Sequence, residues 1–364
     1  MRRKRAVEVL KRTLRNATAV GALVGILVAA TTSGTMAKSA EPKTGAEATC
    51  RPVSMTIPAE VAVSEPVSVP VPDADWTVRG TLCAPRGARA VQLLQSGATY
   101  GSQYWDFDYE PERYSYVRSA NAAGFATLNV DRLGIGTSSH PEPGLLTTAT
   151  EANIAHLLVQ RLRKGSFGRA FDQVAIVGHS YGSVIGLAEA GTYRDIDALV
   201  ATGFDHEVGP GFVSNFAASL APAAIVEPSR FGRLDPTYLT TRPGTRSGFY
   251  YTPNADPKVI ERDEATKQTF TVAEGVTFPA VLPESLRIDS PVYVVVGERD
   301  ALFCGSISDC SSPLSLTSLE RRFYPSASVF DFKAIPDAGH SLNLQQNAPE
   351  TFALINGWLR ENLG

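Results

Sequence analysis

Three short segments of the chain contain residues that together could perform nucleophilic catalysis. Ser180 lies in the pentapeptide "GHSYG", Asp300 follows the apolar run "PVYVVVGER", and His340 ends the segment "AIPDAGH". A serine hydroxyl is a poor nucleophile until a histidine accepts its proton, and the resulting imidazolium is stabilised by a carboxylate. These three residue types therefore predict acyl transfer through a covalent acyl-enzyme.

The pentapeptide around Ser180 fits the pattern G-x-S-x-G and lies between the apolar "VAIV" and the helix-like "SVIGLAEA". A sharp turn between a strand and a helix would push the serine hydroxyl out above a sheet. Side chains larger than hydrogen at Gly178 or Gly182 would collide with the neighbouring strand or helix. The alternative, in which Ser180 is only a small residue in a tight turn, is weakened because Asp300 and His340 also follow expected strands.

The elements that must position these residues alternate between apolar runs and helix-like segments. Strands are expected at residues 53–58, 67–85, 90–97, 125–134, 173–180, 196–204, 291–300 and 328–340. Helices are expected at residues 114–124, 150–165, 180–193, 312–323 and 348–362. This alternation predicts a mostly parallel eight-stranded sheet flanked by helices, in which ligands bind beyond the carboxyl ends of the strands.

The alternation stops between residues 205 and 289, where Pro, Gly and aromatic residues are frequent. A structureless loop of that length would be unusual in a compact domain, so we expect a partly helical cap inserted after the sixth strand. The predicted organisation is therefore a signal peptide at 1–37, a polar leader at 38–49, an α/β core at 50–204 and 290–364, and the cap at 205–289.

The first 37 residues have the order of a secretory signal: basic residues, the apolar stretch "AVGALVGILVAATT" and the small residues "SGTMA". Cleavage is expected near Ala37 or Ala40, which predicts a secreted or extracytoplasmic protein. The apolar stretch is short for a membrane span of about 20 residues, so no stable span is expected after cleavage. A retained anchor is the alternative, and the arginine pair leaves the twin-arginine route open.

Charge and cysteine content narrow the class of protein further. The whole chain has a formal net charge of −3, and removal of the basic leader makes the remainder more acidic, which disfavours nucleic-acid binding. Four cysteines in an exported chain predict two disulfides, and Cys50–Cys83 with Cys304–Cys310 is the most economical of the three pairings. No CxxC spacing occurs and the five histidines are dispersed, so no metal site is predicted.

The mature chain resembles the α/β-hydrolase superfamily in its capped form. The resemblance rests on "LLQSGATYGSQYWDF", "NVDRLGIGTSSHP", "GHSYGS", "GERD" and "DAGHSLN", in the chain order Ser, Asp, His. It implies an α/β-hydrolase fold in which Ser180 is the nucleophile, His340 the general base and Asp300 the acid, without metal or cofactor. Ser96 departs from the histidine that many members have before the glycine after the third strand.

An acyl-transfer site also needs hydrogen-bond donors for the developing oxyanion. The backbone N–H of Tyr181 is expected to be one donor and that of Ala98 the other, with Thr99 as the alternative. The segment "DRLGIGTSS", with Asp131, Gly134, Gly136 and Ser138, matches a loop of the family and is expected to support the site structurally. Six aromatic residues are candidates for the pocket: Tyr100, Tyr104, Trp105, Phe249, Tyr250 and Tyr251.

Other titratable residues compete for these roles. Asp205 could be the acid, because some members of the superfamily have it after the preceding strand. We expect His206 to be a hinge or pocket residue, His179 to be packed, and His140 and His156 to be surface or helix residues.

The sequence predicts an exported serine hydrolase that cleaves a carboxylic ester or lactone, with an apolar small molecule as substrate. An amidase, a peptidase, an acyltransferase or a perhydrolase would use the same three residues, and a ligand-binding protein on this fold would use none of them. An aspartate-nucleophile enzyme is disfavoured because Ser180 occupies the turn. Specificity depends on the cap, so the substrate itself is not predicted.

Overall fold

A computed structural model of the chain describes residues 48–305, 310 and 312–363, with side chains left out at 313–315. The expected signal peptide, and the polar leader up to residue 47, lie outside the described residues. The described residues belong to one compact unit. Within them, no helix combines the length and the apolar character that a membrane crossing needs.

The core is an eight-stranded sheet in the order β1-β2-β4-β3-β5-β6-β10-β11. Its strands are β1 Thr49–Pro58, β2 Asp75–Ala84, β3 Ala90–Gln95, β4 Ala126–Asp131, β5 Gln173–His179, β6 Ala198–Thr202, β10 Val292–Gly297 and β11 Phe330–Ile335. The pairs β1–β2 and β2–β4 are antiparallel and the other five pairs are parallel. The predicted fold class, a mostly parallel eight-stranded sheet flanked by helices, is confirmed.

Several strand boundaries differ from the prediction: β1 begins four residues earlier, β11 ends five residues earlier, and the largest difference is at the start of β2. The strand expected at 67–85 begins only at Asp75, and the residues before it form a loop. Pro70 and Pro72 lie in that loop, and proline cannot donate to the hydrogen-bond ladder of a sheet. The alternating pattern of the loop is therefore not that of a strand.

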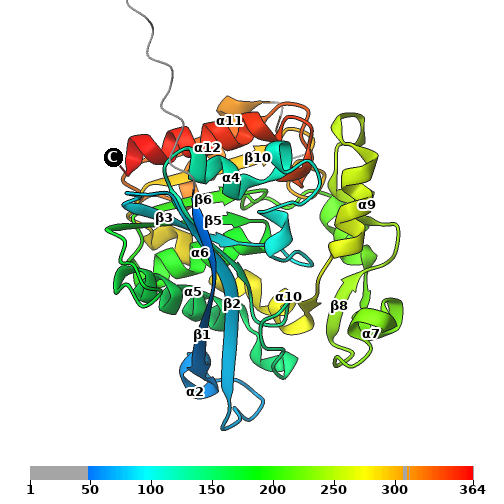
Figure 1. Cartoon of the computed structure of the whole chain (residues 1–364). Coiled ribbons are helices and arrows are strands. Elements are labelled where there is room, and N and C mark those ends of the chain that lie inside the picture. The colour runs from blue at the N-terminus through cyan, green and yellow to red at the C-terminus, as the bar shows by residue number, and fades with distance from the viewer. Residues whose placement is uncertain (1–47, 306–309, 311, 364) are drawn as a thin grey trace, which may run out of the picture. The chain divides into compact units, whose positions relative to one another are not determined.

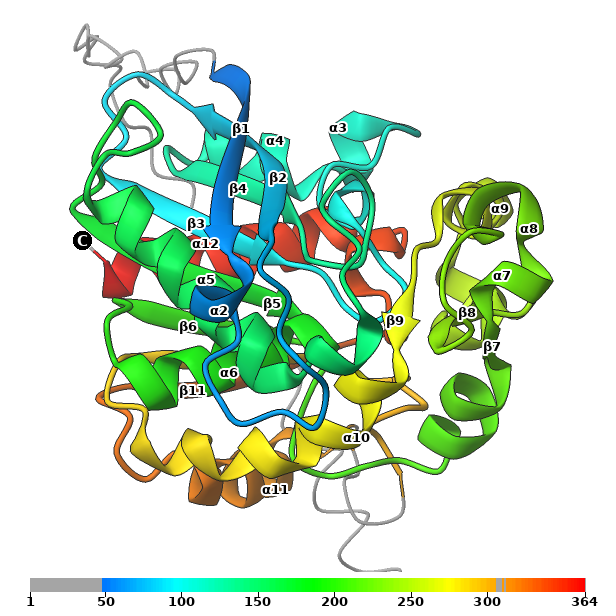
Figure 2. The same cartoon turned by 90° about the horizontal axis from the view of Figure 1, so that it is seen from below.

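Helices cover both faces of the sheet, with α4 and α12 on one face and α5 and α6 on the other (Figures 1 and 2). The α-helices of the core are α2 Ala59–Ala62, α3 Pro111–Tyr114, α4 Tyr116–Ala122, α5 Thr148–Arg163, α6 Tyr181–Tyr193, α11 Pro313–Glu320 and α12 Ala348–Asn362. Strand β5 is buried from Val174 onward because helices pack on both of its sides. Its sequence is accordingly apolar until it reaches the turn at Ser180.

The insertion between β6 and β10 contains helices, as expected, and also a small sheet that the sequence did not predict. Its α-helices are α7 Ala223–Val226, α8 Pro228–Phe231, α9 Pro257–Thr266 and α10 Val272–Val281. Its strands, β7 Leu220–Pro222, β8 Tyr238–Thr241 and β9 Phe270–Thr271, form an antiparallel sheet beside the core (Figure 2). Strands of two to four residues are too short to show a clear alternation of polar and apolar residues.

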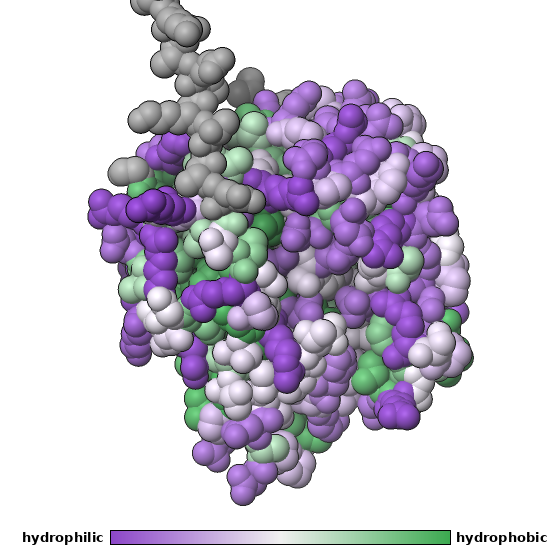
Figure 3. Space-filling model, viewed as in Figure 1, coloured by the Kyte–Doolittle hydropathy of each residue, from purple (hydrophilic) through white to green (hydrophobic). Residues whose placement is uncertain are grey.

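Two disulfides join the cysteines in the pairing that the sequence favours. Cys50 and Cys83 are opposite each other on β1 and β2, and Cys304 bonds Cys310 in the loop after β10. The face of the molecule in Figure 3 is mostly hydrophilic, with smaller hydrophobic areas between the polar residues. Five phenylalanines of the insertion line the site described next, whereas Val213, Ile225 and Val276 of the insertion are exposed.

Candidate active site

The three candidate catalytic residues follow three strands of the parallel part of the sheet. Ser180 comes directly after β5, Asp300 after β10 and His340 after β11. Strands β5, β6, β10 and β11 are parallel neighbours, so their carboxyl ends meet at one edge. Ser180 and His340 line the same pocket at that edge. The topology therefore brings together the residues that the sequence singled out.

Ser180 sits in a strained turn between β5 and α6. Its φ of 54° and ψ of −120° are unusual for a residue with a side chain, and its backbone N–H donates to the carbonyl of Thr202 at 2.8 Å. A Cβ on Gly178 would lie 2.5 Å from backbone atoms of α6, and one on Gly182 would lie 2.1 Å from the carbonyl oxygen of Gln95. The two glycines thus allow the tight approach that exposes Ser180 to the pocket.

His340 and Asp300 form a buried hydrogen-bonded pair. The Nδ1 of His340 donates to Oδ2 of Asp300 at 2.8 Å, and the other carboxylate oxygen accepts the backbone N–H of Leu302 at 2.9 Å. The backbone N–H of Cys304 donates to the Asp300 carbonyl at 2.8 Å. The Cys304–Cys310 disulfide is therefore close in the chain to the carboxylate that pairs with His340. With Nδ1 occupied by Asp300, Nε2 is the ring nitrogen left for chemistry in the pocket.

Asp205, the competing acid, makes other contacts. Its Oδ1 accepts the backbone N–H of Glu207 at 2.8 Å, while the carboxylate paired with His340 is that of Asp300. Burial, followed by the nearby charge of Glu320, raises the pKa of Asp205 to about 9. A carboxyl that stays protonated at neutral pH cannot stabilise an imidazolium by its charge, so the geometry favours Asp300.

The other histidines have packing or hydrogen-bond partners of their own. His206 bonds Glu320 through Nδ1 at 2.7 Å and contacts Ser285 through Nε2, and it does not line the pocket. His179 is buried and stacked on Tyr104, and burial holds its pKa well below the usual range, so its ring is neutral. His179 is therefore packed, as expected.

The pocket is lined mainly by aromatic side chains. Its lining residues are Ala98, Tyr100, Ser180, Tyr181, Val184, Phe204, Phe212, Phe216, Phe249, Phe270, Phe278, Leu302, Phe303 and His340. Of the six aromatic residues proposed from sequence, only Tyr100 and Phe249 lie among them. The other lining phenylalanines were missed; the four-residue spacing of Phe212 and Phe216 was the one local signal that they share a face.

The two expected oxyanion donors both border the pocket. Tyr181 is the first residue of α6, so its backbone N–H has no acceptor within the helix. Ala98 lines the pocket from the loop after β3, where a Cβ on Gly97 would lie 3.0 Å from the Cβ of Ser180. Thr99, the alternative to Ala98, is fully buried, and its hydroxyl accepts a hydrogen bond from Arg246 of the insertion.

The loop after β4 supports the loop after β3, as expected. Asp131 accepts the backbone N–H groups of Ser102 at 3.0 Å and of Thr137 at 3.1 Å. Gly136 has φ of 56°, and a Cβ there would lie 2.1 Å from the Asp131 carboxylate. Asp131 therefore joins the loops after β3 and β4 by hydrogen bonds and does not line the pocket.

A family model described as the alpha/beta hydrolase family matches residues 93–353, which include all three candidate catalytic residues. The chain belongs to this family. Solved structures of similar fold include a monoglyceride lipase from Saccharomyces cerevisiae, with 16% identity, a TM-score of 0.55, and coverage of 82% of this chain and 98% of that one. An esterase from Thermogutta terrifontis has 19% identity, a TM-score of 0.52, and coverage of 81% and 97%. None of the curated proteins matches this chain.

In this alpha/beta hydrolase, a buried ion pair connects the insertion to the loop after β3. Arg246 donates to Asp263 through Nε at 3.0 Å and Nη2 at 2.6 Å, and through Nη1 to the Thr99 hydroxyl at 2.8 Å. Its guanidinium lies 4.0 Å from the centre of the Tyr100 ring. Tyr250 also donates to Asp263, at 2.7 Å. The insertion thus contacts Thr99 and Tyr100, the two residues that follow Ala98.

Arg246→Met is expected to lower the free energy of unfolding by about 3–5 kcal/mol, because it leaves Asp263 charged and buried without its partner. Urea unfolding measures the change. Arg262→Met is the matched control, because Arg262 pairs with Asp108 at the surface and exposed pairs contribute about 0–1 kcal/mol. Equal losses in the two variants would contradict this account of the buried pair.

Proposed function

We propose that this alpha/beta hydrolase cleaves a carboxylic ester of a small molecule through an acyl-enzyme formed on Ser180. The observation that carries the proposal is that Ser180 and His340 line one apolar pocket while Nδ1 of His340 is bonded to buried Asp300. This pairing supports a role for His340 as the base that activates Ser180, with the Asp300 carboxylate stabilising the imidazolium. Solved structures of similar fold, named as a lipase and an esterase, support an ester as the substrate class.

The proposed reaction assigns a role to each group. The hydroxyl oxygen of Ser180 attacks the ester carbonyl while Nε2 of His340 takes the hydroxyl proton. The negative charge that develops on the carbonyl oxygen is stabilised by the backbone N–H groups of Ala98 and Tyr181. His340 then protonates the departing alcohol, and a water molecule activated by the same nitrogen releases the acid and restores Ser180.

The pocket lining supports an apolar substrate. Seven phenylalanines line the space next to Ser180, and the buried Asp300 carboxylate is not among the lining residues. An apolar acyl or alcohol group gains free energy by leaving water for such a lining. A lactone is an internal ester and would react by the same steps. The two disulfides support the proposal that the protein works outside the cytoplasm.

A series of p-nitrophenyl esters with matching p-nitroanilides tests the proposed substrate class. We expect kcat/KM to rise about fourfold per methylene from acetate to butyrate, because each buried methylene contributes about 0.8 kcal/mol. The anilides should react more slowly than the esters. Cleavage of the anilides without cleavage of the esters would favour the amidase alternative, and a constant kcat/KM along the series would contradict an apolar acyl site.

A further inference from the structure

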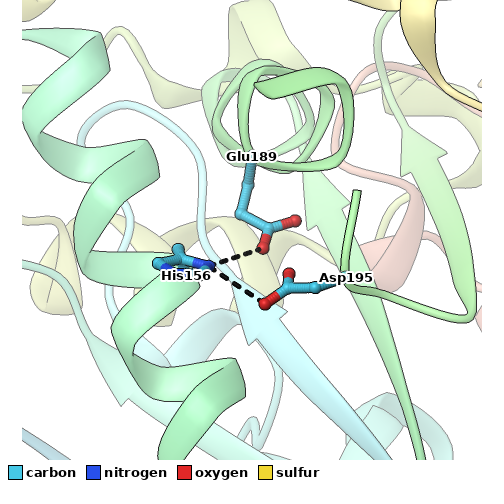
Figure 4. Close-up of side chains that lie close together, drawn as sticks. All are labelled: His156, Glu189 and Asp195. Carbon is cyan, nitrogen blue, oxygen red and sulfur yellow. Dashed lines mark ion pairs between the residues drawn. The ribbon is translucent and has the colours of Figure 1, made fainter. Parts of the chain in front are cut away.

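A second group of ionisable side chains lies between helices α5 and α6, outside the pocket. His156 comes from α5, Glu189 from α6, and Asp195 from the segment that follows α6. Figure 4 shows the three side chains directed toward one another. The Nδ1 of His156 lies 3.0 Å from Oδ2 of Asp195 and 3.9 Å from Oε1 of Glu189, and one ligand atom from each residue lies within 4.8 Å of the others.

Several polar atoms of this group have no hydrogen-bond partner among the described residues. Neither carboxylate oxygen of Glu189 has a hydrogen-bond partner in the described part of the chain, although the side chain is fully buried. The Oδ1 of Asp195 also has no hydrogen-bond partner there. The Nδ1 of His156 is also without a hydrogen bond, although it lies 3.0 Å from Oδ2 of Asp195. Buried polar atoms normally have partners, so their convergence here points to a ligand.

The distances and residue types fit a divalent transition-metal ion. A tetrahedral ion with bonds of about 2.0–2.2 Å to nitrogen and oxygen holds its ligand atoms about 3.3–3.6 Å apart. The two distances from His156, 3.0 and 3.9 Å, lie on either side of that range. An imidazole with two carboxylates suits zinc and similar ions, whereas calcium and magnesium prefer oxygen ligands alone.

Neighbouring residues already orient two of the three ligands. The ring of His156 stacks on that of Tyr193, with centroids 3.9 Å apart, and Gln160 donates to Oδ2 of Asp195 at 2.6 Å. Such outer contacts orient the ligands of metal sites. The side chains of His156 and Asp195 are 22% and 20% exposed, which gives an ion a path from solvent.

We propose that His156, Glu189 and Asp195 bind one zinc-type divalent ion, with water completing its coordination. The ion would join α5 to the end of α6. Glu189 is nine residues after Ser180, which is about 13 Å along a helix, so the ion does not touch the reacting atoms. Its role is structural: it anchors the far end of the helix that begins at the candidate nucleophile.

The competing interpretation is a shared proton in place of an ion. Burial, followed by the nearby Asp195, raises the pKa of Glu189 well above its usual value. A protonated Glu189 could donate to Asp195, and a glutamine at position 189 could make the same donation through its amide. The substitution Glu189→Gln therefore separates the two interpretations, because an amide is a poor replacement for an anionic metal ligand.

The test uses tag-free protein stripped with EDTA and then titrated with zinc chloride. We expect one bound zinc per chain by calorimetry and a rise in Tm of about 3 °C at a hundredfold excess over Kd. Glu189→Gln and His156→Gln should each abolish both effects, whereas His140→Gln, in an exposed histidine beside Tyr238, should retain them. Absence of binding in the parent protein, or retention of binding and of the Tm shift in both ligand variants, would overturn the proposal.

Discussion

Ser180→Ala is expected to lower kcat for p-nitrophenyl butyrate by about 10⁴-fold or more, because it removes the hydroxyl that is proposed to form the acyl-enzyme. Alanine lacks only the hydroxyl, which faces the pocket, so the fold should be retained. Circular dichroism and Tm would verify this while initial rates measure the loss.

Ser183→Ala is the matched control for this substitution. Ser183 lies in the first turn of α6, is fully buried, and donates its hydroxyl to the Thr202 carbonyl at 2.9 Å without lining the pocket. Its loss should cost about 1 kcal/mol of stability and leave kcat near that of the parent. If Ser180→Ala kept the parental rate, the proposed mechanism would fail.

Asp300→Asn is expected to lower kcat by about 10⁴-fold, because an amide nitrogen facing Nδ1 of His340 would favour the wrong tautomer of the ring. The geometry of the pair, 2.8 Å between Nδ1 and Oδ2, would be nearly conserved. The loss should therefore appear in kcat with little change in Tm. Steady-state kinetics at neutral pH measures the effect.

Asp205→Asn distinguishes the two candidate acids. The pKa of Asp205 is raised to about 9, so at neutral pH its carboxyl is protonated and an asparagine resembles it. The parental kcat should be retained. A raised pKa in the folded state makes stability fall as pH rises from about 4 to 9, because the unfolded chain ionises first. The free energy of unfolding of Asp205→Asn, relative to that of the parent protein, should therefore be higher at pH 8 than at pH 5. A large loss of kcat here, and none in Asp300→Asn, would reverse the assignment.

The core strands could be predicted because their burial on both faces demands continuous apolar runs, such as "VAIV" before Ser180. The predicted start of the second strand at residue 67 was wrong, and the strand begins at Asp75. The alternating pattern alone does not show that Pro70 and Pro72 prevent these residues from joining the hydrogen-bond ladder of the sheet. The sheet of the insertion was missed because its strands are two to four residues long. Local pattern is informative only where an element is long enough to repeat it.

The candidate catalytic residues could be proposed from sequence because each follows a predicted strand, and parallel strands end at one edge. The pocket lining could not, since most of its phenylalanines come from the insertion, whose path over the core depends on tertiary contacts such as Arg246 with Thr99. The group at His156 was not singled out from the sequence. Its side chains come from α5, α6 and the segment after α6, and their spacing of 33 and 6 residues matches no common metal-binding motif.

The most direct test of the central claim is the site of reaction with a fluorophosphonate, which modifies only an activated serine. The protein would be treated with the probe, digested, and examined by mass spectrometry. The account predicts a single adduct on the peptide that contains Ser180, and none in His340→Ala, which keeps the hydroxyl but lacks the base. An adduct on another serine, or unmodified Ser180 in a folded parent protein, would contradict it.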